Sequence, residues 1–302
     1  LRRSSAASDV YKRQMLGISV LDYFDLYKKF TYVRQESYKL NYIAKVELGE
    51  SKLDNPYETF KDFYTKDYQR FVEYNIQDVE LVDRLEDKMK LIELCLTMAY
   101  DYKVNYTDVY SQVRCWDTII YNHLLTKNII IPPREDHDKD TQYEGAYVKD
   151  PQLGLHNWIV SFDLNSLYPH LIMQYNLSPE TLVGVQPKNM GVENYLNEKF
   201  NLQWARDKNV TVAPNGSMYR RDKQGFLPEL MEKMYGDRVV FKKKTIEAKK
   251  EFQKTKDPIY KNEISRCNNI QMAKKISLNS AYGAIGNQYF RYFDVRIAEA
   301  IT

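Results

Sequence analysis

Apolar residues along much of this chain recur at the spacing of a helix. Residues 66–124 carry the longest such stripe, which predicts an extended helical region because one apolar face repeats about every 3.6 residues. Two further helical patterns run over roughly 228–256 and 259–283. Asp257-Pro258 separates them, and since proline cannot continue a helix and restricts the residue before it, we expect an antiparallel helical hairpin. The first stripe comprises Val79, Leu81, Val82, Leu85, Met89, Leu91, Leu94, Leu96 and Met98.

Shorter patterns indicate a strand and turns between these helices. The apolar run 158–162 predicts a buried strand that ends at Asp163, followed by a turn and a helix from Pro169 onward. Asn215-Gly216, in a polar stretch of the chain, predicts a hairpin turn. The fold that we expect is α/β and multidomain.

Composition places the chain among globular proteins of more than one domain. With 302 residues, 43% of them hydrophobic and 28% charged, it can bury two or three cores. The proline-rich, charged stretch 127–157 has the composition of a linker, so we place a domain boundary there. We expect neither a membrane span nor a secretory signal. Cys95, Cys115 and Cys267 stand far apart, which indicates no disulfide framework, no thiolate zinc site and a reducing compartment.

Positive charge is concentrated at two places in the chain. The formal net charge is +3, and residues 1–14 alone account for it with four Lys or Arg against one Asp. Because residues 1–14 are typical of a translated sequencing adaptor, we exclude them from the fold; the alternative is a genuine basic arm. Residues 231–275 hold thirteen Lys or Arg against six Asp or Glu. This second region therefore predicts a basic surface on the helical hairpin.

The segment Ser161-Phe-Asp-Leu-Asn-Ser-Leu-Tyr-Pro169 is the first candidate for chemistry. A carboxylate at the end of a strand can hold a divalent cation, while the free N–H groups of the next helix meet an anion. The alternative is structural, because a lone Asp more often caps the following helix. Asp163 is therefore a candidate metal ligand on this pattern alone.

The second candidate lies on the helical hairpin. Lys275, Asn279 and Tyr282 share one helical face, so a charge, an amide and an aromatic ring can meet phosphate, sugar and base together. Arg238 and Lys242 stand four residues apart, on one face of the helix. An arginine guanidinium beside a lysine ammonium group commonly binds phosphate oxygens. The alternative is a solvated basic face balanced by nearby glutamates.

Together these segments resemble motifs of the family B DNA polymerases. The Asp163 segment resembles the family's DxxSLYP motif, and residues 275–283 resemble KxxxNSxYG. Residues 74–78 resemble the YxxxD motif of a 3′–5′ exonuclease, residues 143–146 resemble the YxGG/A loop, and residues 238–242 resemble the fingers motif RxxxK. The resemblance covers essentially all of the chain from residue 15 onward, and its character is that of tailed-phage replicative polymerases.

The resemblance implies a role for each matched residue. Asp163 would ligate two catalytic Mg²⁺ ions, with help from the Leu164 carbonyl, and Tyr168 would exclude a ribose 2′-hydroxyl. In the exonuclease, Asp78 would ligate metal and Tyr74 would orient the attacking water. The nucleotide-binding set would be Leu164, Ser166, Leu167, Tyr168, Arg238, Lys242, Lys275 and Asn279, and the DNA-binding set Tyr143, Gly145, Ala146, Tyr282 and Gly283.

The resemblance also implies a domain order and partners. Expected partners are primer–template DNA, deoxynucleoside triphosphates and a sliding clamp bound through sequence C-terminal to this chain. No membrane association is expected. The expected location is the cytoplasm, or the host cytoplasm if the source is a virus. The expected parts are the end of an RNase H-like exonuclease (15–90), a helical connector (91–133), the first part of a palm (134–224), helical fingers (225–287) and the start of a second palm segment (288–302).

Departures from the family pattern limit what the chain can do by itself. His170 stands where the family often has serine, and neither the carboxylate motif DTDS nor the first two exonuclease motifs occur in the sequence. We therefore expect a fragment that ends inside the palm and is inactive in both reactions. Two alternatives are a non-catalytic nucleic-acid-binding protein that uses the basic hairpin, and an RNA polymerase, which Tyr168 opposes. The acidic run 136–140 is expected to be a solvated loop that holds no metal.

Overall fold

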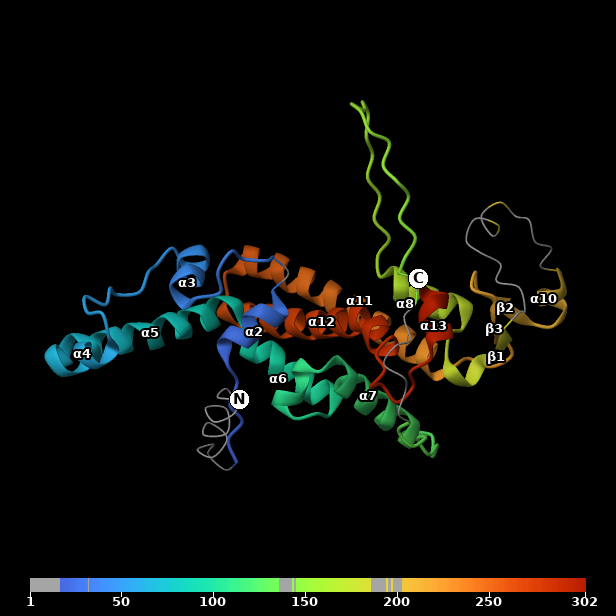
Figure 1. Cartoon of the computed structure of the whole chain (residues 1–302), viewed down its shortest axis with the longest axis horizontal. Coiled ribbons are helices and arrows are strands. Elements are labelled where there is room, and N and C mark those ends of the chain that lie inside the picture. Colours follow the sequence, from blue (N-terminus) through green and yellow to red (C-terminus); the bar gives the residue numbers. More distant parts are fainter. Residues whose placement is uncertain are drawn as a thin grey trace. The chain divides into compact units, whose positions relative to one another are not determined.

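The computed structural model describes residues 17–31, 33–135, 143, 145–185, 194, 197 and 203–302. The adaptor-like residues 1–14, the acidic run 136–140 and Glu144 lie outside these residues. The chain forms two compact units, Leu1–Ala99 with Asn105–Tyr110, and Tyr100–Val104 with Ser111–Thr302. Each unit has buried apolar residues of its own, and Figure 1 shows their elements.

The described part of the first unit is helical. Its buried residues include Leu26, Phe63 and Leu81, which are fully inaccessible to solvent. Helix α5 begins after Asp67, whose side chain accepts a hydrogen bond from the Arg70 N–H, and it ends at the left-handed Lys90. The elements are α2 (Tyr23–Phe30), α3 (Leu40–Leu48), α4 (Phe60–Lys66), α5 (Tyr68–Met89), α6 (Leu91–Tyr102, whose last residues belong to the second unit) and the 3₁₀ helix η1 (Tyr106–Tyr110).

The second unit combines helices with a small antiparallel sheet. Its strand order is β1-β3-β2, and β2 and β3 form a hairpin. Gly216 adopts a φ of 86° in the hairpin turn, so the turn expected at Asn215-Gly216 is confirmed. The elements are α7 (Gln112–Thr126), α8 (Leu167–Tyr175), η2 (Pro179–Thr181), β1 (Leu182–Val185), α10 (Gln203–Asp207), β2 (Val210–Val212), β3 (Ser217–Arg220), α11 (Phe226–Thr255), α12 (Pro258–Ile285) and α13 (Val295–Ile301).

Helices α11 and α12 form the expected helical hairpin. Lys256 ends α11 in a left-handed conformation, and Asp257 caps α12 by accepting a hydrogen bond from the Ile259 N–H at 2.9 Å. Pro258 is the first residue of α12, where its lack of an N–H costs nothing. The two helices lie side by side along their length (Figure 1). Their apolar faces bury Met231 and Leu278 in the second unit.

The prediction of a buried strand at residues 158–162 is wrong. Trp158 has a φ of 59°, which is incompatible with an extended strand, and no described strand pairs with this run. Trp158 is 99% exposed and Phe162 is 89% exposed. Figure 1 shows the green trace around this segment running out from the helices of its unit and back. A strand needs hydrogen-bonding neighbours, and an apolar run in the sequence does not supply them.

Candidate functional site

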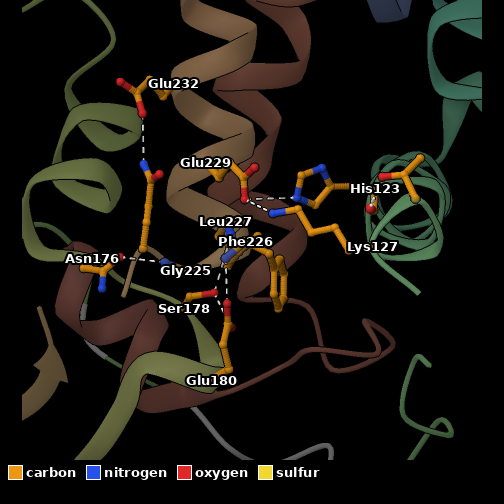
Figure 2. Close-up of polar contacts among 12 residues, drawn as sticks. His123, Lys127, Asn176, Ser178, Glu180, Gly225, Phe226, Leu227, Glu229 and Glu232 are labelled. Atoms are coloured by element: carbon orange, nitrogen blue, oxygen red, sulfur yellow. Dashed lines mark hydrogen bonds and ion pairs between the residues drawn. The ribbon is translucent and has the colours of Figure 1, made fainter. Parts of the chain in front are cut away.

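The N-terminus of α11 is fixed by side chains from the loop that follows α8. Asn176 Oδ1 accepts a hydrogen bond from the Gly225 N–H at 2.9 Å, and Glu180 Oε1 accepts one from the Phe226 N–H at 2.6 Å. Ser178 Oγ accepts a third from the Leu227 N–H at 3.4 Å. Figure 2 shows these acceptors gathered at the start of the helix. They satisfy free N–H groups there, which sets the direction in which α11 leaves the loop.

A second set of polar contacts joins α11 to α7. His123 Nε2 lies 3.3 Å from Glu229 Oε2, and Lys127 forms an ion pair with the same carboxylate (Figure 2). The hydrogen bond from Lys127 is the main reason that the pKa of Glu229 is lowered. Burial lowers the pKa of His123 and outweighs the attraction of Glu229. Near neutral pH this contact therefore holds a charged Glu229 beside a neutral imidazole.

The two basic residues expected on α11 lie in different surroundings. Arg238 Nη1 donates a hydrogen bond to Ser166 Oγ at 3.0 Å, across 72 positions of sequence. Arg238 Nε is buried without a hydrogen-bond partner among the described residues. Lys242, one turn further along α11, is exposed. The guanidinium therefore faces the turn that precedes α8, and its Nε donor has no described acceptor.

Three tyrosines from separate motif segments meet at Tyr282 of α12. The ring centroids of Tyr168 and Tyr282 are 4.9 Å apart. Tyr143 hydrogen-bonds to Tyr282, and burial together with this bond raises the pKa of Tyr282. The hydroxyl of Tyr143 also lies 2.1 Å from where a Cβ at Gly286 would stand, so a side chain there would displace the Tyr143 ring. Gly286 was not among the expected site residues, because this close approach depends on a segment far away in sequence.

The remaining expected residues of α12 lie, like Tyr282, in the C-terminal part of the helix. Lys275 is half-buried, Asn279 is exposed, and Gly283 is exposed. A Cβ at Gly283 would lie 3.0 Å from Gln112 Oε1, which makes this a tight contact. Residues 145 and 146, expected to bind DNA, lie exposed in the irregular segment. The structure therefore brings Tyr143, but not Gly145 or Ala146, against the α12 residues that it describes.

Asp163 lies in the irregular segment ahead of α8 rather than at the end of a strand. Its side chain is exposed, as are Leu164 and Leu167. Ser166, with a φ of 54°, precedes α8 without capping it by a side-chain hydrogen bond. Within the described residues, no three His, Cys, Asp or Glu side chains are placed to hold a metal ion together. Asp163 and the Leu164 carbonyl therefore do not form a metal site by themselves.

His170, which departs from the expected serine, has a structural place in α8. Its Nδ1 lies 2.9 Å from the Ser166 carbonyl oxygen, and its ring packs edge-on against Tyr235 of α11, with centroids 4.7 Å apart. The larger side chain thus fills the contact between α8 and α11. It leaves Asp163 untouched.

The exonuclease candidates lie together in the first unit. Asp78 Oδ2 is 2.6 Å from Lys52 Nζ, and Lys52 Nζ is 4.7 Å from the ring centroid of the buried Tyr74. Burial opposes the charge on Lys52, but the hydrogen bonds and charges of Asp78 and Tyr74 raise its pKa overall. Asp78 Oδ1 is buried without a hydrogen-bond partner among the described residues. Lys52 was missed because it lies 26 positions before Asp78, in a segment with no recognisable motif.

Comparisons with known proteins agree with one another. The family model for DNA polymerase family B matches residues 104–302. The chain is 34% identical to a DNA-directed DNA polymerase from Escherichia phage RB69 and 33% identical to one from Enterobacteria phage T4, over 95% of its length in both cases. It spans 36% of each of these relatives.

A solved structure is similar in fold. The family B DNA polymerase from the hyperthermophilic archaeon Pyrobaculum calidifontis matches with a TM-score of 0.69 and 22% sequence identity. The match covers 96% of this chain and 35% of that one. No helix in the described part of the chain combines the length and apolarity needed to cross a membrane.

Proposed function

The chain belongs to the family B DNA polymerases, and on that premise we propose that the protein containing it copies DNA from a primed template and proofreads with a 3′–5′ exonuclease. The observation that carries the proposal is the meeting of three motif segments, 161–169, 238–242 and 275–283. Arg238 donates to Ser166 at 3.0 Å, and Tyr168 lies 4.9 Å from Tyr282 between ring centroids. Residues that would touch phosphate, sugar and base are thereby gathered from three helices, α8, α11 and α12.

The proposed nucleotide site follows from the chemistry of these side chains. Arg238 has a buried Nε donor without a described partner, and a phosphate oxygen would satisfy it. Lys242 and Lys275 would supply further positive charge to a triphosphate, supported by Asn279. The ring of Tyr168, held against Tyr282, would occupy the space that a ribose 2′-hydroxyl needs. Leu164 and Leu167, which flank Ser166, complete the proposed set.

The catalytic metals of such a polymerase need more ligands than the described residues provide. We propose Asp163 as one carboxylate ligand, with the Leu164 carbonyl beside it, for a pair of Mg²⁺ ions. A pair of cations is normally held by several carboxylates, and the described residues place no group of three metal-binding side chains around Asp163. The chain alone is accordingly expected not to extend a primer.

The proposed exonuclease residues fit their roles more directly. The unsatisfied, buried Oδ1 of Asp78 suits a cation ligand, since a bound cation would compensate its desolvation. Lys52 holds the other oxygen of the same carboxylate at 2.6 Å. Tyr74, one turn earlier on α5, would orient the attacking water. Asp78 is one ligand of such a site, and the described residues supply no group of three.

Primer–template DNA and deoxynucleoside triphosphates are the proposed partners. Tyr282 and Gly283 would face the nascent base pair, with Tyr143 held against Tyr282 and Gly145 and Ala146 on the adjoining segment. The domain assignments made from the sequence and the sliding clamp belong to this proposal as well. Its support is the family and the convergence of the motif residues in the second unit.

Two substitutions in the full-length protein test the proposal. Asp163→Asn removes a proposed ligand of the polymerase metals and should abolish primer extension, while degradation of single-stranded DNA continues. Asp78→Ala should abolish degradation and leave extension intact. The physical reason is that the two carboxylates lie in different units of the chain, so each change removes one metal site. Primer-extension and degradation assays on the same preparations measure both activities.

Asp83→Ala is the matched control for Asp78→Ala. Asp83 is an exposed acidic residue of the same helix α5, five positions later, and its replacement should leave both activities unchanged. If Asp163→Asn or Asp78→Ala stops both reactions in folded protein, the assignment of one reaction to each carboxylate is wrong. A full-length wild-type protein without extension activity would contradict the polymerase function itself.

A further inference from the structure

Lys274 is buried between two carboxylates in the second unit. It is 9% exposed, and among the described residues it is the only charged side chain that is buried to this extent. Its Nζ lies 2.9 Å from Asp101 Oδ1 and 3.5 Å from Asp237 Oδ2. Burying an ammonium group is costly unless opposite charges compensate it. The lysine is therefore held in one place by both carboxylates.

These three charged residues come from three helices. Asp101 lies in the last turn of α6, Asp237 on α11 and Lys274 on α12. Tyr102, next to Asp101, donates a hydrogen bond to the Ala273 carbonyl oxygen at 3.0 Å and accepts one from Ser277 Oγ. Residues 101 and 102 thus hold one turn of α12. We call Asp101, Tyr102, Asp237, Lys274 and Ser277 the lysine junction.

The lysine junction adjoins the proposed nucleotide site in sequence at two points. Asp237 precedes Arg238, and Lys274 precedes Lys275. Successive residues of a helix point about 100° apart, so the junction and the proposed phosphate-binding residues occupy different faces of the same helical turns. Fixing Asp237 relative to Lys274 therefore also fixes Arg238 relative to Lys275.

The lysine junction controls the axial register of α11 and α12. A slip of one helical turn would move one helix by about 5.4 Å along the other. Such a shift would prevent Arg238 and Lys275 from holding the same triphosphate in the same way. We propose that Lys274 is a positioning residue, which keeps α11 and α12 in the register that nucleotide binding requires. This inference rests on the proposed polymerase function.

The test is Lys274→Met in the full-length protein. Misplacing one charge-assisted contact to a phosphate should raise the nucleotide KM about 10- to 100-fold, while the affinity for primer–template DNA and the exonuclease rate remain unchanged. Lys274→Arg should restore much of the nucleotide affinity, because a guanidinium can pair with both carboxylates. Steady-state kinetics at varied nucleotide concentration separate KM from kcat.

Arg266→Met is the matched control. Arg266 lies on the same helix α12 and forms an exposed ion pair with Glu263 at 3.1 Å, so its loss should leave the nucleotide KM unchanged. Hydrogen exchange of the 302-residue chain gives a second measurement that needs no activity. Backbone amides of α11 near Asp237 and of α12 near Lys274 should exchange faster in Lys274→Met, and should be unaffected in Arg266→Met.

Asp101→Asn keeps the size of the side chain and replaces Lys274→Met if that variant does not fold. It should also raise the nucleotide KM and leave the affinity for primer–template DNA unchanged. An unchanged KM in a folded variant would overturn the positioning role, whereas equal loss of polymerase and exonuclease rates would show a general structural role and overturn it too. A wild-type protein that incorporates no nucleotide would contradict the proposed function instead, and the hydrogen-exchange result would still decide whether the junction holds the helices.

Discussion

Gly225, which directly precedes α11, has too little room for a side chain. A Cβ at this position would lie 2.5 Å from Ser178 Cβ and 3.1 Å from Thr181 Cγ2. Both neighbours are buried, so neither can move without disturbing the loop that accepts the first hydrogen bonds of α11. The backbone of Gly225 is in the extended region, and the requirement for glycine is therefore one of space rather than of φ.

We predict that Gly225→Ala lowers the free energy of unfolding of the chain by about 1–3 kcal/mol, the usual cost of overpacking. Gly236→Ala, inside the helix that Gly225 precedes, is the control, since a Cβ there would meet nothing within 4 Å. It should stabilise the chain by up to about 1 kcal/mol, because alanine favours a helix over glycine. Urea denaturation compares the two variants. Equal effects would show that the contact with Ser178 relaxes freely.

The sequence indicated which motif residues would share a site, but not the individual contacts that they make. The motif residues Arg238 and Tyr168 were expected at the nucleotide site, and the structure places them near Ser166 and Tyr282 respectively. Lys52 was not expected beside Asp78, and the tight approach of Tyr143 to Gly286 was not expected either. Such contacts join residues distant along the chain, and no local pattern specifies them.

At the scale of elements, α7 and α11 are joined by a contact that depends on pH. Burial lowers the pKa of His123 below its usual value of about 6.5, and the neighbouring cations Lys127 and Lys233 act in the same direction, against the attraction of Glu229. The unfolded chain therefore binds a proton more readily than the folded one. Stability linked to His123 is present above the ordinary histidine pKa and is lost as the pH falls below it.

We predict that the urea midpoint of the chain falls between pH 7 and about pH 5.5, and that His123→Gln reduces this fall. Glu229 adds little over this interval, because its pKa is lowered from an ordinary value of 4.5. Tryptophan fluorescence is a suitable probe, since Trp116 on α7 is buried. A pH dependence identical in the two proteins would exclude His123 as the responsible group.

Helices were predictable where the pattern and the stop signals were both local. The hairpin expected at 228–256 and 259–283 was observed as Phe226–Thr255 and Pro258–Ile285, because Asp257-Pro258 marks its turn in the sequence. The region 66–124 was expected to be helical, but the break at Lys90 could not be seen. A left-handed lysine carries no sequence signal as clear as that of glycine.

At the scale of the whole molecule, the segment around residues 158–162 differs most from the sequence prediction. Its apolar residues were expected inside a sheet, but the described sheet is complete without them. Leu153 is 95% exposed and Leu155 is 96% exposed, in addition to Trp158 and Phe162. Scattered exposed apolar residues are ordinary, whereas a run of them on unpaired backbone favours association with another chain.

We predict that the 302-residue chain, produced alone, associates through this segment. Replacing Trp158 and Phe162 with serine together should reduce light scattering at a given concentration and leave the helical circular dichroism unchanged, because neither side chain is buried. The control replaces Ile259 and Tyr289 with serine. These two side chains are 66% and 65% exposed but are not part of the segment. This control should scatter as strongly as the unmodified chain. If the Trp158 and Phe162 variant associates to the same extent as the control, the unpaired segment does not drive association, and its exposure in the chain has no consequence for solubility.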